Sequence, residues 1–440
     1  MEQSTARLSQ RLRTATAELH AHLEQLPFFQ ALEQGTLQRE SYIGLLRALA
    51  PVHAALETAC EGATHPALHA VWRPSMRRLP ALERDLQELD AARVAPEPLA
   101  MLHARMLSEH LAECAQRQPE ALLGALYVLE GATLGSPIVR AWVRRAFALE
   151  QAGVRYLSSY DDQAAERWRS FTRRLDAALP DAAAQTPAIA LACAVFTALA
   201  RIVEALHPLG ARPPHALLHA LNPEAGHHPI TEEWRELEAA LRAGERSWRD
   251  CPYYAARYGE RGQRFTRSDS AWLAGLTRHA PPVIDHQIAW LGRLLAARGM
   301  PRWLLECHLF VLADELARAL PEHAQRYAQL TQAAHKLRAE RLALLDEADF
   351  ISLAARLEAQ LTPDRRQHLA NIGRVLVAAV LDDEAGIAHA LSSVETWLCD
   401  PQRFDASWRA AVRDSIAATR QQVQQRRAGG ARVTQSSVPS

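Results

Sequence analysis

Residues 124–140 read GALYVLEGATLGSPIVR, an apolar helical run that contains Gly131 and Gly135 and meets a proline at Pro137. A glycine inside a helix costs about 0.5–1 kcal/mol relative to alanine, so this pair needs a structural reason. The spacing i to i+4 places both glycines on one face, and the missing side chains predict a continuous trough about one turn long. Close helix packing, a bend, or room for a flat ligand would each explain the trough.

The sequence on both sides of this run predicts an all-α fold. Alanine, leucine, arginine and glutamate dominate, and apolar residues recur at helical spacing along most of the 440-residue chain. Short turns containing Gly, Pro or Asp separate the predicted helices. In the first half, these amphipathic helices are expected at 12–26, 40–60, 102–117, 124–149, 165–179 and 189–206.

The length of the chain favours more than one domain. We predict a helical domain over residues 1–207 and a Pro/His-rich linker over 208–230, which reads PLGARPPHALLHALNPEAGHHPI. A second helical domain of unknown function is predicted over 231–425. The polar segment 426–440 is expected to be a disordered tail.

Composition excludes several classes of partner and compartment. Lys+Arg and Asp+Glu both number 50, so no overall charge attracts nucleic acid or an anionic membrane. The six cysteines show no CxxC pair, which argues against a zinc site or a disulfide framework. The N-terminus has no apolar signal region, and no run of about 18 uninterrupted apolar residues is present. We therefore expect a cytoplasmic protein with no membrane insertion.

A histidine on the first predicted helix is a candidate metal ligand. His20 has Arg13 two turns earlier and Glu24 one turn later on roughly the same face. A lone histidine on an amphipathic helix is usually a half-buried polar group. Neutral imidazole is also a good iron ligand, and a single axial histidine leaves the opposite coordination position free. A helix bared by glycines over that position would present its backbone to a flat ring.

Two arginines on a later helix suit a ligand that bears carboxylates. Arg169 and Arg173 stand at i and i+4 in RWRSFTRRLDAAL, one turn apart. Such a pair can hold carboxylates by charge-assisted hydrogen bonds, as the propionates of a haem require. The alternative is a solvated basic face. Only the coincidence of this pair with His20 and the glycines favours a planar iron ligand with carboxylates.

The stretches LRTATAELHAHLEQLPFFQALEQGTLQRESYIGLLRAL and LGALYVLEGATLGSPIVRAW resemble the biliverdin-producing haem oxygenases of the bacterial type, over about residues 8–207. The resemblance implies a haem-oxygenase-like helical bundle in which His20 is the proximal haem ligand and metal-binding residue. It places Glu24 where the family commonly has an acid near that histidine. It also implies catalytic roles for Gly131 and Gly135, whose small size lets the distal helix flex over the haem.

The resemblance extends to the basic residues, with one departure near the distal helix. Arg13 matches a basic position on the proximal helix, and Arg169 and Arg173 fall in the helix that contacts the propionates. The family commonly has a second glycine where this chain has Ser136, followed by Pro137. Because proline lacks a backbone N–H, we expect a bend here, which is either part of a working site or the mark of a lost function.

The activity that the resemblance implies is the cleavage of haem b, which serves as both cofactor and substrate. The reaction takes O2 and external electrons and yields biliverdin, carbon monoxide and ferrous iron. The chain has no GxGxxG motif, so the electrons are expected from a separate reductase or ferredoxin. Two alternatives stand beside the enzyme. One is a non-catalytic haem- or bilin-binding sensor or carrier, and the other is a helical interaction protein with a vestigial pocket.

The second half carries an aromatic and glycine cluster in CPYYAARYGERGQRFTRSDSAWLAGL. It could be a recognition surface, but the favoured interpretation is that Gly259 and Gly262 end a helix, Ser268 or Asp269 caps the next one, and the aromatic residues pack between helices. His308 lies in apolar surroundings, where a satisfied core histidine is commoner than a second haem ligand. The role of this half is left open among regulation, docking of a reductase, and contact with a bilin acceptor.

Overall fold

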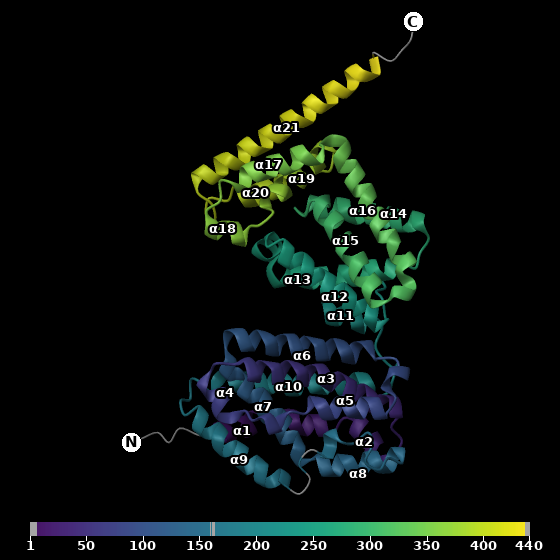
Figure 1. Cartoon of the computed structure of the whole chain (residues 1–440), viewed down its shortest axis with the longest axis vertical. Helices are drawn as coiled ribbons and strands as arrows, with labels where there is room; N and C mark the ends of the chain where they lie inside the picture. Colours follow the sequence, from purple (N-terminus) through teal and green to yellow (C-terminus); the bar gives the residue numbers. More distant parts are fainter. Residues whose placement is uncertain (1–6, 159, 161–162, 436–440) are drawn as a thin grey trace. The chain divides into compact units, whose positions relative to one another are not determined.

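The computed structural model describes residues 7–158, 160 and 163–435, and every regular element among them is helical. The predicted all-α fold is therefore confirmed. The chain divides into two compact units, Met1–Ala216 and Leu217–Ser440, whose helices are labelled in Figure 1. The division falls inside the segment 208–230 that the sequence predicts to be a linker, close to the short helix α11 (Ala216–Leu221).

The first unit is a bundle around one apolar core. Its elements are α1 (Leu8–Glu24), α2 (Pro27–Gln34), α3 (Arg39–Gly62), α4 (Pro66–Val71), α5 (Leu79–Glu88), α6 (Pro98–Arg117), α7 (Leu122–Gly131), the 3₁₀ turn η4 (Ala132–Leu134), α8 (Ser136–Phe147), α9 (Ala164–Ala178) and α10 (Thr186–Leu206).

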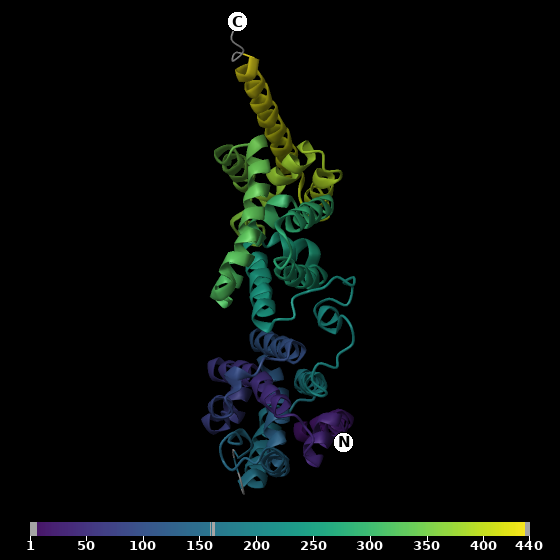
Figure 2. The same ribbon diagram turned by 90° about the vertical axis from the view of Figure 1, so that its right-hand side faces the viewer.

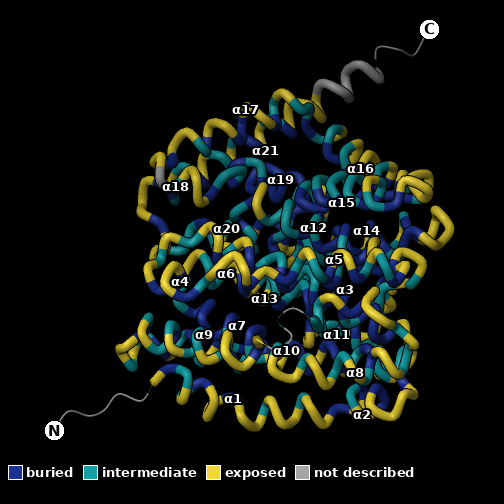
Figure 3. The backbone as a smooth tube through the Cα atoms, turned by 60° about the horizontal axis from the view of Figure 1, so that its bottom comes forward, coloured by how far each residue is buried: buried dark blue, intermediate teal, exposed yellow. Residues whose placement is uncertain are grey.

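Helix α10 is the central helix of the first unit, and it contacts α1, α3, α6 and α7. It is long and apolar enough to cross a membrane, but its apolar surface is shared among these neighbouring helices. Gly124 sets its approach to α7, since a Cβ atom there would lie 1.8 Å from the Ala188 carbonyl oxygen. Helix α1 lies on the outside of the bundle and is mostly exposed, with Leu8, Leu12 and Thr16 buried (Figure 3).

The run 124–149, predicted as one helix, is two helices separated by the η4 turn and bent by 57°. Pro137 lies in the first turn of α8, where its missing N–H leaves no intrahelical bond unmade. Two carbonyls at the break receive side-chain hydrogen bonds, because the Thr133 hydroxyl donates to Glu130 (2.6 Å) and the Ser136 hydroxyl to Ala132 (3.1 Å). The bend expected from Pro137 is confirmed.

The second unit is also helical. After α11, its α-helices are α12 (Trp234–Asp250), α13 (Tyr253–Leu276), α14 (Pro281–Ala297), α15 (Arg302–Ala319), α16 (Ala324–Leu344), α17 (Glu347–Glu358), the short α18 (Pro363–His368), α19 (Ile372–Glu384), α20 (Ala390–Leu398) and α21 (Ala406–Gln435). Helices α12, α15 and α16 pack together around one apolar cluster, and α17, α19 and α21 pack around another.

The last helix corrects the predicted tail. Figure 2 shows α21 as one long helix near the C-terminus, and it extends to residue 435. The predicted disordered tail begins at residue 426, but Arg426 and Arg427 continue the helix and form ion pairs with Asp346 (2.9 Å) and Glu384 (2.7 Å). These pairs give the polar sequence tertiary partners that composition alone does not reveal. Residues 436–440 lie outside the described part of the chain.

The glycine cluster of the second half also differs from its interpretation. Gly259 has a left-handed backbone (φ 53°) and interrupts α13, as a helix-ending glycine would. The next helical stretch begins well before the predicted cap, so Ser268 and Asp269 lie inside α13 and cap nothing. Their side chains are therefore available for contacts across the second unit.

Candidate active site

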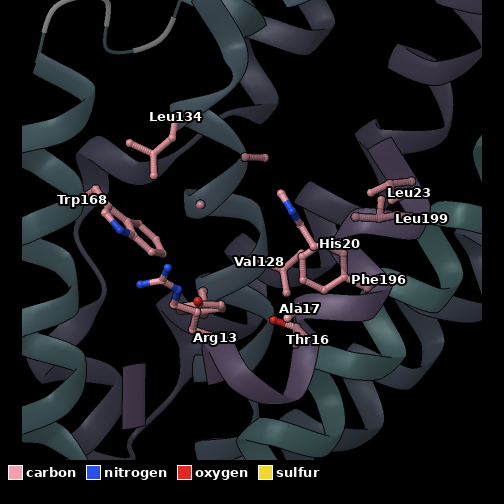
Figure 4. A pocket seen from close by; sticks show the side chains of 13 residues that line it. Arg13, Thr16, Ala17, His20, Leu23, Val128, Leu134, Trp168, Phe196 and Leu199 are labelled. Carbon is pink, nitrogen blue, oxygen red and sulfur yellow. The ribbon is translucent and has the colours of Figure 1, made fainter. Parts of the chain in front are cut away.

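A cavity of about 510 Å³ opens in the first unit between α1, the α7–η4 break, α9 and α10 (Figure 4). Its volume falls within the range of about 300–1,000 Å³ that is usual for small-molecule sites. The residues that line it are Arg13, Thr16, Ala17, His20, Leu23, Tyr127, Val128, Gly131, Ala132, Leu134, Trp168, Phe196 and Leu199. Arg13, His20 and Gly131, which the sequence singles out, thus meet in one cavity.

His20 projects from α1 into this cavity (Figure 4). Its side chain is 55% exposed, and its ring meets Phe196 edge-on at 5.6 Å between centroids. Its Nδ1 atom lies 3.6 Å from the Glu24 carboxylate, beyond hydrogen-bond distance but close enough for electrostatic attraction. The phenyl ring and the carboxylate limit the orientation of the imidazole, while the ring is still accessible as a ligand.

The bare backbone of Gly131 forms part of another wall. A Cβ atom at this position would lie 3.4 Å from the Trp168 ring, so a larger side chain would extend into the space between α7 and α9. Gly135 does not line the cavity, and a Cβ atom there would meet only the Ala132 carbonyl oxygen at 3.9 Å. The two glycines therefore differ: the first keeps the cavity open, and the second lies at the bend.

A buried ion pair fixes the end of α7 beside Gly131. Glu130 accepts a hydrogen bond from Arg78 (3.1 Å) and another from the Tyr160 hydroxyl (2.9 Å). The Arg78 guanidinium also lies over the Tyr160 ring, 4.1 Å from its centroid. Burial raises the pKa of Glu130, and the charge of Arg78 opposes that rise. The residue next to Gly131 is thus held by two partners that also contact each other.

The cations are distributed differently from the sequence prediction. Arg13 lines the cavity near Tyr127. Burial raises the pKa of Tyr127, and the charge of Arg13 opposes this rise. Arg169 and Arg173 are exposed on α9 and do not line it. Trp168 faces the cavity instead, because α9 turns the side bearing Trp168, Phe171 and Leu175 toward the bundle.

Most of the apolar wall carries no mark in the sequence. Tyr127, Trp168, Phe196, Leu134 and Leu199 line the cavity but were assigned no role in it. The helical spacing of Trp168 and Leu175, seven residues apart, was the available signal for the inward face of α9. Phe196 and Leu199 lie on a core helix, where an apolar residue carries no local mark of a ligand site.

The donor set limits the kind of metal group that could fit. Within residues 7–158, 160 and 163–435, no cluster of three or more His, Cys, Asp or Glu side chains could hold a bare metal ion. A lone accessible imidazole in an aromatic cavity instead suits an iron that already has four ring nitrogens as ligands. The flat space beside Gly131 and the cation of Arg13 fit the plane and the carboxylates of such a ring.

Comparisons with known proteins identify the family of the first unit. The family model "Heme oxygenase" matches residues 6–205. A heme oxygenase from Xanthomonas campestris pv. campestris (strain 8004) is 31% identical over 174 residues, which make up 38% of this chain and 91% of that protein. The chain therefore belongs to the heme oxygenase family, and the resemblance noted in the sequence is confirmed.

Solved structures of that family also match the chain. Heme oxygenase-1 from the cyanobacterium Synechocystis sp. PCC6803, in complex with heme, is 21% identical with a TM-score of 0.43, over 46% of this chain and 93% of that one. Heme oxygenase from Leptospira interrogans is 21% identical with a TM-score of 0.41, over 45% of this chain and 98% of that one.

Proposed function

We propose that this chain is a haem oxygenase, which cleaves haem with O2 and electrons from a separate reductase or ferredoxin to biliverdin, carbon monoxide and ferrous iron. The observation that carries the proposal is the placement of an accessible His20 and the bare backbone of Gly131 on walls of one cavity of about 510 Å³. Membership of the heme oxygenase family supports it. A cytoplasmic location, where such electron donors work, is part of the proposal.

Each residue of the cavity has a role that its position supports. His20 would bind the haem iron through the imidazole nitrogen that does not face Glu24, since Glu24 would hold the proton on the other nitrogen. Haem, when bound, supplies the iron at which O2 is activated and is also the molecule that is cleaved. Gly131 would leave room for the ring, and Trp168 and Phe196 would supply apolar surface against it.

The carboxylates of haem need positive partners at the cavity. Arg13 is the cation that lines it, and Tyr127 next to it offers a hydroxyl. The contact of Arg169 and Arg173 with the propionates stays a prediction. Because both residues are exposed, their long side chains would have to reach around Trp168 to make that contact. Contacts with the propionates would orient the ring in the cavity.

The test is turnover of hemin by the purified full chain in air, with ascorbate or a ferredoxin and its reductase as donor and an iron chelator present. We expect the Soret band to fall while a red-absorbing bilin band grows and carbon monoxide is released. The same mixture without oxygen should keep its Soret band. A stable haem complex that never degrades would contradict the enzyme and favour a haem sensor or carrier.

A further inference from the structure

The second unit contains a cavity of about 680 Å³ between α12, α13, α14 and α15. It is larger than the cavity of the first unit and lies within the size range of small-molecule sites. Four aromatic side chains line it, from Trp248, Tyr254, Tyr258 and Phe265. The proposed cleavage of haem assigns no role to this cavity.

Its histidine is not available as a metal ligand. His308 is buried, and both of its ring nitrogens lie at hydrogen-bond distance from serine hydroxyls, Nδ1 from Ser247 (2.9 Å) and Nε2 from Ser270 (3.0 Å). Burial lowers the pKa of His308 to about 4, so the ring is neutral at pH 7. This cavity therefore offers a haem iron no free imidazole.

The available polar group is a carboxyl. Asp269 lines the cavity from α13, and within the described part of the chain its carboxylate has no hydrogen-bond or ion-pair partner. Protein atoms crowd the carboxyl, and this burial raises its pKa to about 7, while the charge of Arg298 opposes the rise. A half-buried carboxylate without a protein donor is destabilising, and N–H groups from a ligand would offset this destabilisation.

The two arginines that line the cavity differ in their partners. Arg261 is paired with Glu224 at 2.8 Å and lies over the Phe265 ring. Arg298 lines the cavity from an exposed position, and its side chain has no hydrogen bond or ion pair to any described residue. The cavity thus combines a hydrogen-bond acceptor, Asp269, with an exposed cation, Arg298.

The aromatic walls suit a conjugated ligand. The rings of Trp248 and Tyr254 are stacked, 5.6 Å apart and inclined by 15°, which presents broad aromatic surfaces to the cavity. Met300 adds a polarisable side chain to the lining. A ligand that satisfies the cavity has an extended π system, N–H groups for Asp269 and a carboxylate for Arg298.

We propose that this cavity binds an open-chain tetrapyrrole, with its pyrrole N–H groups on Asp269 and a propionate on Arg298. This inference rests on the proposed function, since an open-chain tetrapyrrole is the organic product of haem cleavage. Haem has the same propionates and a flat ring, but its central nitrogens are occupied by iron and donate no N–H to Asp269. The unavailable His308 and the available Asp269 therefore favour the product over the substrate.

The test supplies biliverdin directly, so that its outcome does not depend on turnover by the first unit. The full chain carries Ala17→Trp, which places a large side chain in the first cavity from an exposed position on α1. Biliverdin is titrated into this protein and followed by the shift of its red absorption band. We expect one site per chain, and about tenfold weaker binding in Asp269→Asn.

Matched variants keep the test specific. Asp285→Asn removes a carboxylate of α14 that pairs with Lys336 and does not line the cavity, and it should leave the affinity unchanged. Arg298→Gln should weaken binding severalfold, whereas Arg293→Gln in α14, the helix that ends just before Arg298, should not. Circular dichroism checks that each variant is folded.

Three results would overturn the proposal: no biliverdin site in the Ala17→Trp chain, equal affinity in Asp269→Asn, or preferential binding of hemin. If biliverdin binds as expected but hemin is not degraded by the unmutated chain, the proposed enzyme fails while the bilin site stands. If hemin is degraded and biliverdin does not bind, the enzyme stands and the bilin site fails.

Discussion

The two cavities contain the same kinds of residue in exchanged roles. In the first, His20 is accessible and the acid next to the cavity, Glu130, is satisfied by Arg78 and Tyr160. In the second, His308 is satisfied by two serines, and the acid Asp269 has no partner among the described residues. The group left without a partner shows what each site can bind, a Lewis-acidic iron in one and N–H donors in the other.

This contrast shows that residue type alone does not define a site. Both histidines lie on helices among apolar neighbours, and sequence patterns describe them in similar terms. Their hydrogen bonds decide the difference, because a histidine with both nitrogens engaged cannot bind a metal without losing a partner. Removing partners one at a time is therefore the way to test the comparison.

The largest difference is expected between Glu130 beside the first cavity and Asp269 in the second. Glu130→Ala leaves Arg78 buried without its partner and should lower the free energy of unfolding of the first unit by about 3–5 kcal/mol. Asp269→Ala removes a charge that has no partner and should be neutral or stabilising at pH 8. Urea denaturation followed by circular dichroism measures both.

A surface pair serves as the control for these acids. Glu113→Ala breaks its exposed ion pair with Arg117 and should cost at most about 1 kcal/mol. Equal costs for Glu130→Ala and Glu113→Ala would show that the buried network does not hold the end of α7.

The next effect distinguishes the two glycines of the opening stretch. Gly131→Leu extends a side chain toward Trp168 inside the cavity and should reduce hemin turnover at least about tenfold, or about 1.4 kcal/mol in activation free energy. Gly135→Leu meets open space and should reduce turnover less. Comparison of kcat and KM for hemin in both variants provides the measurement. A larger loss at Gly135 would show that movement of the bend matters more than space at the cavity wall.

How much the sequence predicts depends on whether a feature is local. The bend at Pro137 and the candidacy of His20 follow from residues close together in the chain, and the family resemblance supports both. The continuous trough predicted from Gly131 and Gly135 does not form, because Gly135 lies at the bend and does not line the cavity. Which side of α9 faces the cavity depends on the helices that pack against it. The sequence therefore suggests Arg169 and Arg173 as the contacts of a ligand, whereas Trp168 lines the cavity. The local sequence suggests that Asp269 is a helix cap. Its neighbours in the second cavity come from helices distant in sequence, so the local pattern does not reveal its place in that cavity.

A smaller effect is expected in the pH dependence of the second unit. The pKa of Asp269 is raised from 3.8 to about 7, so the folded state binds the extra proton and stability falls as pH rises through this window. His308, lowered from 6.5 to about 4, acts in the opposite sense between pH 4 and 6.5. In the wild type the two trends oppose each other.

The variant Asp269→Asn should separate these trends. Its stability should exceed that of the wild type by on the order of 1 kcal/mol at pH 8, and this excess should shrink toward pH 4. Urea denaturation at several pH values measures the excess, with Asp285→Asn as the control. A pH-independent difference would mean that Asp269 titrates normally in the folded chain.

The smallest effect is expected at the cations of the first cavity. Arg13→Gln should weaken hemin binding about threefold, because Arg13 is exposed and water screens its charge. Arg169→Gln and Arg173→Gln are the matched comparison, and no change is expected from either if only lining residues contact the propionates. A loss at Arg169 or Arg173 equal to that at Arg13 would show that α9 or its side chains move when hemin binds.

The most direct test of the account is whether His20 is the iron ligand. Hemin is titrated into the full chain, into His20→Ala, and into His22→Ala, which changes a half-exposed histidine two residues away that faces Glu204 and does not line the cavity. The account predicts the Soret band of a histidine-ligated haem in the wild type and in His22→Ala, its loss in His20→Ala, and its return when imidazole is added to that variant. An unchanged Soret band in His20→Ala would contradict the assignment of the site.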